Sequence, residues 1–232
     1  MRGQLILEAV VGSHAYGLAT PESDQDFLGV YQTPTTAWLG LHQPQESIVT
    51  HSPNDKAIHE LGKFVRLCLQ NNPTVMELLW LDEYRVRTEV GDQLIAIRES
   101  FLSQKSRKTY GGYSVSQLER LKRREDGSFS SDLRKRTEKH GRHCYRLILQ
   151  GGNILREGRL RVRLNDDEVQ QCREAGLMAA NDVEELSKMI DAAMVEFDAI
   201  ESDLPECPDE YVVEEFLVKA RLDQLGKNFI ES

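Results

Sequence analysis

The stretch that decides the fold is an apolar run ending in Gly-Ser, followed by a second apolar run led by Asp-x-Asp. It reads Val10-Val11-Gly12-Ser13-His14-Ala15-Tyr16-Gly17-Leu18, and then Ser23-Asp24-Gln25-Asp26-Phe27-Leu28-Gly29-Val30-Tyr31. Residues 5–11 are short, apolar and ended by turn-forming residues, which predicts a buried strand. Residues 24–31 predict a second strand, and since side chains alternate along a strand, Asp24 and Asp26 share a face.

These residue types, in this order, favour a site for a metal ion and a nucleotide. Two carboxylates on one face suit Mg²⁺, which prefers few carboxylates together with phosphate oxygens and water. Gly12 lets the backbone approach a phosphate because it has no Cβ. The Ser13 hydroxyl and the N–H groups after it can donate to phosphate oxygens. Gly-Ser alone marks a turn and Asp-x-Asp alone is usually a solvated face, so the prediction rests on their combination.

The next predicted elements are a helix over residues 56–70 and a strand over residues 74–81. Apolar residues recur at helical spacing in the first segment, and Asn54 or Asp55 could cap it. An Asn-Asn-Pro sequence then ends the helix. Residues 74–81 are apolar and β-rich apart from Glu77, and a carboxylate in the middle of such a strand either lies at an edge or has a function.

The second half is predicted to be mostly helical. Helices are expected over residues 90–102, 114–124 and 135–149, with breaks at the glycine pairs 111–112 and 151–152. A polar loop covers 125–131, basic and apolar residues alternate over 158–164 as in a strand, and helical patterns cover 183–200 and 211–225. The sequence therefore predicts an α+β fold, with a small mixed sheet and flanking helices in residues 1–100 and a mostly helical domain in residues 101–232.

The net charge of -9 hides a strong asymmetry. Residues 105–146 hold 13 Lys and Arg against 5 Asp and Glu, a balance of +8, whereas residues 166–232 hold 5 against 19, a balance of -14. The basic segment suits a polyanion such as a nucleoside triphosphate or RNA; alternatively, the two segments pack together and neutralise each other. No apolar stretch approaches the roughly 20 residues of a membrane span. The 4 cysteines are widely spaced and predict free thiols in a reducing cytoplasm.

The opening motif resembles the signature of the DNA polymerase beta superfamily of nucleotidyltransferases. The matching residues are Gly12-Ser13-x-Ala15-Tyr16-Gly17-Leu18-x-Thr20-Pro21-x-Ser23-Asp24-x-Asp26 and Gly29-Val30. The Ala-Tyr-Gly-Leu insert is similar to that of the RNA-repair-pathway subgroup, the RlaP-like proteins. The resemblance covers roughly residues 8–165, since it continues in Leu61-x-Lys63-Phe64 and Leu67, in Asn72-Pro73-Thr74-x-x-Glu77-Leu78-Leu79, and in Lys139-x-x-x-His143-x-x-Arg146-Leu147.

The resemblance implies that Gly12 and Ser13 grip a nucleoside triphosphate and that Asp24 and Asp26 hold Mg²⁺ or Mn²⁺. In that superfamily a third carboxylate follows on a strand after a helix, which points to Glu77 as a catalytic and metal-binding residue. Many relatives have Asp at this position, and Glu is one methylene longer. Asp55 is the alternative, since it could end a strand beside the pair or simply cap a helix.

Five basic residues are candidates for contacts with the triphosphate: Lys63, Arg66, Lys139, His143 and Arg146. Lys63 and Arg66 are one turn apart on a predicted helix, so they either face phosphates or form its solvated side. Lys139, His143 and Arg146 have the spacing i, i+4, i+7 and share one helix face. The resemblance implies that this face closes over the triphosphate, and the alternative is a solvated basic helix.

The predicted function is Mg²⁺-dependent transfer of a nucleoside monophosphate from a triphosphate to a hydroxyl, with release of pyrophosphate. Catalysis is then mainly positioning and charge stabilisation. The acceptor is an RNA end, a protein hydroxyl or a small molecule, and RNA would bind through residues 105–146. A catalytically silent nucleotide or RNA sensor is the alternative, which the intact Asp24 and Asp26 disfavour. A third hypothesis is a toxin–antitoxin type protein whose acidic C-terminal part binds a partner.

Overall fold

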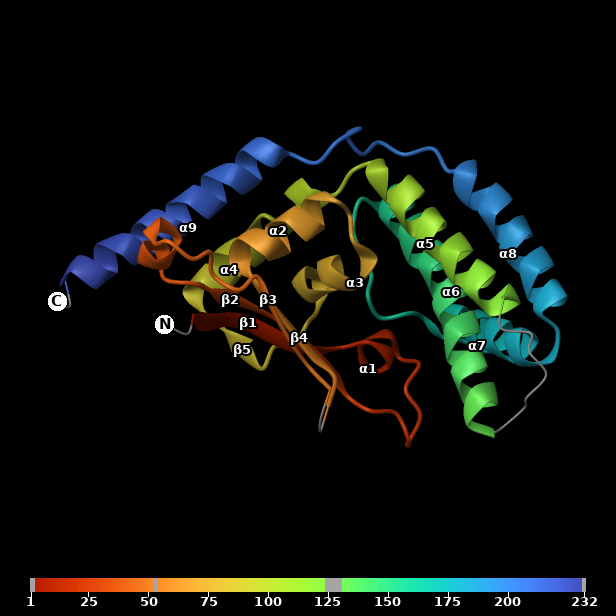
Figure 1. Cartoon of the computed structure of the whole chain (residues 1–232). Coiled ribbons are helices and arrows are strands. Elements are labelled where there is room, and N and C mark those ends of the chain that lie inside the picture. Colours follow the sequence, from red (N-terminus) through yellow and green to blue (C-terminus); the bar gives the residue numbers. More distant parts are fainter. Residues whose placement is uncertain (1–2, 52–53, 124–130, 231–232) are drawn as a thin grey trace. The chain divides into compact units, whose positions relative to one another are not determined.

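The computed structural model describes residues 3–51, 54–123 and 131–230 (Figure 1). Packing divides the chain into two units. The first comprises Met1–Phe101 with Pro208–Ser232, and the second comprises Leu102–Cys207. The fold is α+β, with strands in the first unit and a helical second unit. Among the described helices, none is long and apolar enough to cross a membrane.

A five-stranded mixed sheet forms the centre of the first unit, with the order β3-β4-β2-β1-β5. Its strands are β1 (Gln4–Val11), β2 (Asp26–Gln32), β3 (Ser47–Thr50), β4 (Lys56–Glu60) and β5 (Val86–Arg87). β2 runs antiparallel to β1 and parallel to β4. The strand predicted over residues 5–11 is confirmed, and its alternate residues Leu7 and Ala9 are fully buried. They lie opposite Val30 and Leu28 of β2, which are buried on the same face.

The helix predicted over residues 56–70 is wrong in its first third. Residues 56–60 form β4, and helix α2 begins five residues later, over Leu61–Leu69. Neither Asn54 nor Asp55 caps it, because the Glu60 side chain accepts the Gly62 N–H at 2.7 Å. Helix α2 buries the predicted apolar stripe, including Phe64 and Val65.

The strand predicted over residues 74–81 is wrong. This segment forms the short helix α3 (Pro73–Met76) and the 3-10 helix η2 (Glu77–Trp80). The Asn72 side chain accepts the Thr74 N–H at 3.1 Å, and Pro73 occupies the first helical position, which its fixed φ favours. The apolar run is buried on every side, so it carries no alternation that separates a strand from a helix.

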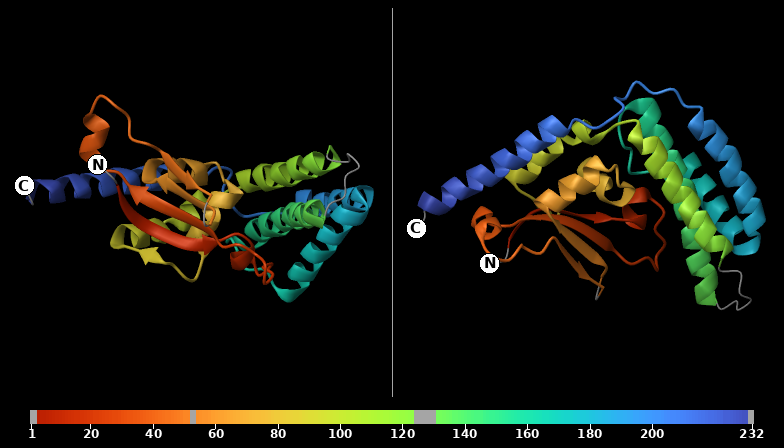
Figure 2. Two further views of the ribbon diagram at one scale, coloured as in Figure 1. Left: turned by 60° about the horizontal axis from the view of Figure 1, so that its bottom comes forward. Right: turned by 45° about the horizontal axis from the view of Figure 1, so that its top comes forward.

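The first unit contains five other helical elements within the described residues. They are α1 (Ser13–Tyr16), η1 (Thr35–Leu39), α4 (Glu89–Ala96), η3 (Arg98–Phe101) and α9 (Glu210–Ile230). Helix α9 contacts η1, η3, α2 and α4, and Figure 2 shows it running along this unit. The Gln32 side chain donates to the Ala220 carbonyl at 2.8 Å. Residues 208–232 thus pack with the first unit, whereas the sequence division groups them with residues 101–207.

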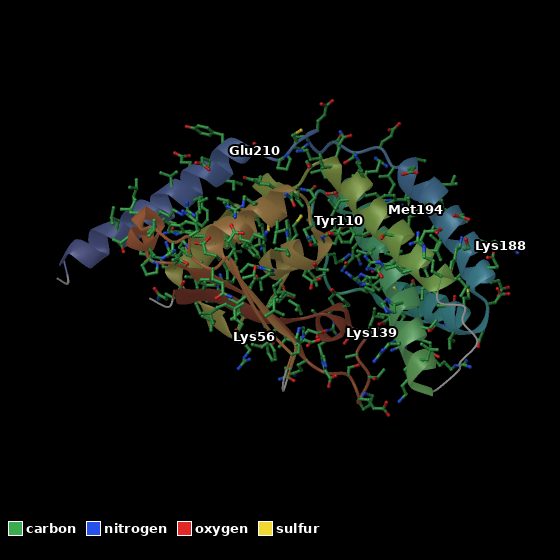
Figure 3. All side chains as sticks on the ribbon, in the orientation of Figure 1. Lys56, Tyr110, Lys139, Lys188, Met194 and Glu210 are labelled. Atoms are coloured by element: carbon green, nitrogen blue, oxygen red, sulfur yellow. The ribbon has the colours of Figure 1, made fainter. Side chains whose placement is uncertain are left out.

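The second unit is built from α5 (Lys105–Lys122), α6 (Ser131–Glu157), α7 (Asp166–Asn181) and α8 (Val183–Asp198). The helix breaks predicted at the two glycine pairs are wrong. A Cβ at Gly151 would lie 2.7 Å from Tyr110 Cβ, and one at Gly111 would lie 3.0 Å from Met194 Cε. These glycines therefore let helices approach closely; Tyr110 on α5 and Met194 on α8 are labelled in Figure 3. Helix α6 ends instead at Gly158, whose φ is 63°.

The strand predicted over residues 158–164 is also wrong, because this segment joins no ladder among the described strands. Its alternation has a different cause: Leu160, Val162 and Leu164 are buried against the helices, and the Val162 carbonyl accepts the Gln150 side-chain N–H at 2.9 Å. Of the loop predicted over 125–131, residues 125–130 lie outside the described residues and Ser131 begins α6.

Candidate active site

The turn after β1 is held in a single conformation by its own backbone. Gly12 has φ 70° and ψ -147°, Gly17 has φ 80°, and the one-turn helix α1 lies between them. The Tyr16 N–H donates to the Gly12 carbonyl at 3.1 Å, and the Leu18 N–H donates to the Ser13 carbonyl at 2.9 Å. Tyr16 and Leu18 are buried while Ser13 is partly exposed, so the turn presents Ser13 from a fixed base.

Gly12 and Asp26 lie against one another. Val11 is paired with Asp26 across β1 and β2. A Cβ at Gly12 would lie 2.3 Å from Asp26 Oδ2, so the carboxylate fills the space that any other residue's side chain would need. Glycine is required here by its backbone conformation and by this contact. The Gly-Ser turn and the second aspartate of Asp-x-Asp are therefore in direct contact.

The link between the two motifs is a short hydrogen-bonded turn. Ser23 N–H donates to the Thr20 carbonyl, and the Ser23 hydroxyl accepts the Thr20 N–H, both at 2.9 Å. His14 Nε2 lies 3.1 Å from the Ser23 carbonyl and joins α1 to this turn. β2 begins at Asp26, so the prediction that Asp24 lies within the strand is wrong. Asp24 is exposed in the approach to the strand, and Asp26 is partly buried at its first position.

Asp55 directly precedes β4, the strand that runs parallel to β2. Phe27 is paired with Lys56, and the Phe27 N–H donates to the Asp55 carbonyl at 2.8 Å. Extending the register of the two strands by one residue places Asp55 opposite Asp26, and neighbouring strands are about 4.8 Å apart. Its carboxylate is 64% exposed and lies 2.9 Å from His51 Nδ1. Asp55 takes second place in the sequence prediction because residues 56–60 have the pattern of a helix, whereas they form β4.

Glu77 is in a different setting from the one predicted. It begins η2 rather than lying in a strand, and it is only 2% exposed. The Tyr16 hydroxyl donates to Glu77 Oε2 at 2.6 Å. Within the described part of the chain, no three His, Cys, Asp or Glu side chains are grouped closely enough to hold a metal ion. Glu77 thus contacts the turn through Tyr16, and its assignment as a metal ligand loses the strand on which it was based.

The two cations of α2 share a single carboxylate. Arg66 Nη2 bonds Glu46 Oε1, and Lys63 Nζ lies 3.8 Å from Glu46 Oε2. Both side chains are more than one-third exposed. One carboxylate offsets only one of these two positive charges, and a role of Lys63 and Arg66 in binding phosphate stays a prediction.

The basic face predicted on α6 is only partly exposed. Lys139 is exposed, but Arg146 is fully buried and hydrogen-bonds Gln150 Oε1 and His143 Nδ1 on its own helix, the latter at 2.9 Å. Burial lowers the pKa of His143 to about 3, and the charges of Arg146, His140 and Lys139 add to this effect. Arg146 and His143 thus have partners inside the second unit, and their contact with a triphosphate stays a prediction.

Comparison with known protein families shows to which family this chain belongs. A family model described as RlaP, the RNA repair pathway DNA polymerase beta family, matches residues 2–213. The chain belongs to the RlaP family. A search of curated proteins found no match.

Among solved structures, this RlaP chain is similar to a nucleotidyltransferase-like protein from Exiguobacterium sibiricum 255-15, with a TM-score of 0.31 and 13% identity. The alignment covers 99% of this chain and 73% of that one. A TM-score of this size carries no argument about function.

The RlaP core also contains a cluster that the sequence analysis missed, on the sheet face opposite Asp26. Glu8 of β1 is 3% exposed and pairs with Lys56 of β4, labelled in Figure 3, and with Arg85 at 3.5 Å. The Arg85 guanidinium lies 4.7 Å from the Phe27 ring centroid, within reach of a cation–π interaction. Phe27 follows Asp26 on β2, and Lys56 follows Asp55 at the start of β4. The cluster therefore joins these two strands next to the two aspartates, on the opposite face of the sheet. A charged residue inside an apolar strand was the available signal.

Proposed function

We propose that this chain is a Mg²⁺-dependent nucleotidyltransferase that transfers a nucleoside monophosphate from a triphosphate to a hydroxyl and releases pyrophosphate. The observation that carries the proposal is the contact between the Gly-Ser turn and Asp26, in a chain of the RlaP family. A phosphate-approaching turn and a metal-binding carboxylate must be adjacent if one triphosphate is to touch both. In this structure a single pairing, Val11 with Asp26, achieves that.

The residues present fit Mg²⁺ better than a metal ion that is held entirely by protein ligands. Mg²⁺ is held by one or two carboxylates together with substrate phosphates and water, and it does not need a complete cage of protein ligands. Asp24 and Asp26 supply two carboxylates. When bound, the ion would neutralise charge on the phosphates. Ser13 and the backbone N–H groups of the turn would orient the triphosphate.

Asp55 rather than Glu77 is the third carboxylate in this proposal. It directly precedes β4, opposite Asp26 in the extended register of the two parallel strands, and it is exposed, so it can meet an incoming acceptor. Its place beside the metal-binding pair suits a group that orients or deprotonates the attacking hydroxyl. Glu77 is buried and already accepts the Tyr16 hydroxyl.

An RNA end is the acceptor class that we favour. The family description refers to an RNA repair pathway, and residues 105–146 carry a charge balance of +8. Much of that charge is accessible, since Lys105, Lys108 and Lys139 are exposed. Such a segment attracts a phosphodiester backbone without reading its sequence. A protein hydroxyl or a small molecule would not require it.

The test is release of pyrophosphate from each of the four labelled triphosphates, with RNA, protein and small-molecule pools as acceptors. The double variant Asp24→Asn, Asp26→Asn should lose activity by roughly 10²–10³-fold or more, since charge stabilisation of the transition state is removed. Asp55→Asn should lose a comparable factor. Asp92→Asn is the matched control, because Asp92 is an exposed carboxylate of the same unit that pairs with Arg87. Equal turnover by wild type and the double variant contradicts the proposal.

A nucleotide-binding protein without catalysis is the second candidate. The absence of a three-carboxylate group among the described residues favours it. It predicts that the wild type binds a triphosphate with Mg²⁺ but releases no pyrophosphate with any acceptor pool. Measuring binding and turnover on the same preparation separates the two functions.

A further inference from the structure

A hydrogen bond between two buried side chains joins the Gly-Ser turn to a segment of the first unit that is distant in the sequence. Tyr16 projects from α1 and Glu77 begins η2, 61 residues later in the sequence. Their hydroxyl and carboxylate oxygens are 2.6 Å apart. Tyr16 and Leu18 are the buried residues of the turn, and the hydrogen bond to Glu77 gives Tyr16 a polar attachment in addition to its packing.

This hydrogen bond is short. Its two oxygens are 2.6 Å apart, near the short end of the range for O–H···O hydrogen bonds. A carboxylate that is almost fully buried also depends on its hydrogen bonds, because burying it without them is costly. Removing the Tyr16 hydroxyl therefore costs more here than it would at the surface.

Glu77 is itself held on a firmly anchored segment. Asn71, at φ 53°, donates its side-chain N–H to the Phe101 carbonyl at 2.8 Å. Asn72 then caps α3, which leads directly into η2. The Tyr84 hydroxyl donates to the Leu78 carbonyl at 2.9 Å, one residue beyond Glu77. Glu77 thus lies on a segment held by several hydrogen bonds, and α1 is bonded to this segment through Tyr16.

We propose that Glu77 is a positioning residue that, through Tyr16, holds the Gly12–Ser13 turn in the conformation that binds the triphosphate. The inference rests on the proposed function for its ligand, and it assigns Glu77 a role that does not involve the metal. It predicts that Tyr16 and Glu77 act as one unit. It also predicts that an acceptor oxygen, not a negative charge, is what position 77 must supply.

The first experiment follows the turn without any nucleotide. Hydrogen exchange of the Tyr16 and Leu18 amides, which bond the Gly12 and Ser13 carbonyls, is measured in the full chain. Tyr16→Phe and Glu77→Ala should each speed exchange by about tenfold to a hundredfold, the range for leaving a buried hydrogen-bond partner unsatisfied. Glu77→Gln keeps an acceptor oxygen and should remain near wild type. Tyr84→Phe is the matched control, since it removes a tyrosine hydroxyl that bonds the Leu78 carbonyl of η2 instead of joining η2 to α1.

The second experiment measures ligands on the same variants. Tyr16→Phe and Glu77→Ala should raise the KM for the triphosphate by a similar factor, with a smaller change in kcat, and the double variant should be no worse than either single one. Binding of Mn²⁺ alone, followed by electron paramagnetic resonance, should match wild type in all of them and fall in Asp26→Asn. If Glu77→Ala folds poorly, Tyr16→Phe alone decides the result.

The outcomes separate the positioning role from the proposed function. Unchanged exchange in Tyr16→Phe, or loss of Mn²⁺ binding in Glu77→Gln, overturns the positioning role. A wild-type protein that binds no triphosphate contradicts the proposed function instead, and the exchange of the two amides then still decides whether Glu77 holds the turn.

Discussion

Replacing Gly12 with alanine should damage the site more than the fold. The new Cβ would lie 2.3 Å from Asp26 Oδ2, whereas ordinary contact begins near 3.4 Å. The carboxylate must therefore retreat by about 1 Å, and a displacement of that size at a reacting centre can cost roughly 10²-fold in rate. Because a carboxylate can rotate away from the methyl group, most of the clash is relieved by moving the metal ligand.

The cost to stability is worked from the backbone. Gly12 has φ 70° and ψ -147°, close to a region that only glycine occupies readily. An alanine held there costs about 1–3 kcal/mol. Turning the Asp26 side chain away from its preferred rotamer adds roughly 1 kcal/mol. Gly12→Ala should therefore lower the free energy of unfolding by about 2–4 kcal/mol while the protein still folds.

Gly158→Ala is the matched control for the backbone term. Gly158 also has a positive φ, 63°, but a Cβ there would meet nothing within 4 Å. It should lose only about 1 kcal/mol and keep full activity. Urea unfolding and pyrophosphate release are measured for both variants. If Gly12→Ala retains turnover within twofold of wild type, the contact between the turn and Asp26 is not part of the active site.

Two further predictions concern the second unit. Gly151→Ala should destabilise it by about 1–2 kcal/mol, since overpacking against Tyr110 outweighs the better helix propensity of alanine. Gly112→Ala should stabilise it by up to about 1 kcal/mol, because a Cβ there would meet no described atom within 4 Å. Thermal unfolding of both variants checks the opposite signs, and equal shifts of the two melting temperatures contradict the packing role of Gly151. Burial lowers the pKa of His143 to about 3 in the folded state, whereas the unfolded chain takes up this proton near pH 6.5. The contribution of His143 to the free energy of unfolding should therefore be complete above pH 6.5 and be lost as the pH drops toward 3. The expected loss at pH 5 is about 2 kcal/mol. Urea titrations of wild type and His143→Gln across this range test it, and an unchanged acid slope in the variant refutes it.

The first two strands could be predicted from the sequence because their signals are local. An apolar run that ends in Gly-Ser identifies β1, and the run after Asp26 identifies β2. Strand β4 could not be found in the same way. Ile58 lies at helical spacing from Leu61, so residues 56–60 extend the helix pattern, and only the pairing of Lys56 with Phe27, far away in the sequence, makes them a strand.

The helical unit shows the same limit for glycine. Read locally, the pairs at 111–112 and 151–152 predict helix ends, because glycine is a poor helix former. The structure contains both pairs inside long helices, since Gly111 and Gly151 lie where helices approach closely. Gly158, with a positive φ and no neighbour, is the glycine that ends α6. Which role a glycine has depends on its tertiary neighbours, which no window of sequence contains.

Glu77 was selected from the sequence as a metal ligand, for a reason that the structure does not support. A carboxylate within an apolar run is a sound signal of function, since burying it needs specific partners. The sequence could not say which partners, and the family pattern suggested a metal. The structure provides a hydroxyl instead, on the turn that carries Ser13. Glu8 has the same signal and also has partners behind the site, Lys56 and Arg85. Buried carboxylates here thus support the site from behind and from the side, and the exposed ones, Asp24 and Asp55, are the candidates for contact with ligand.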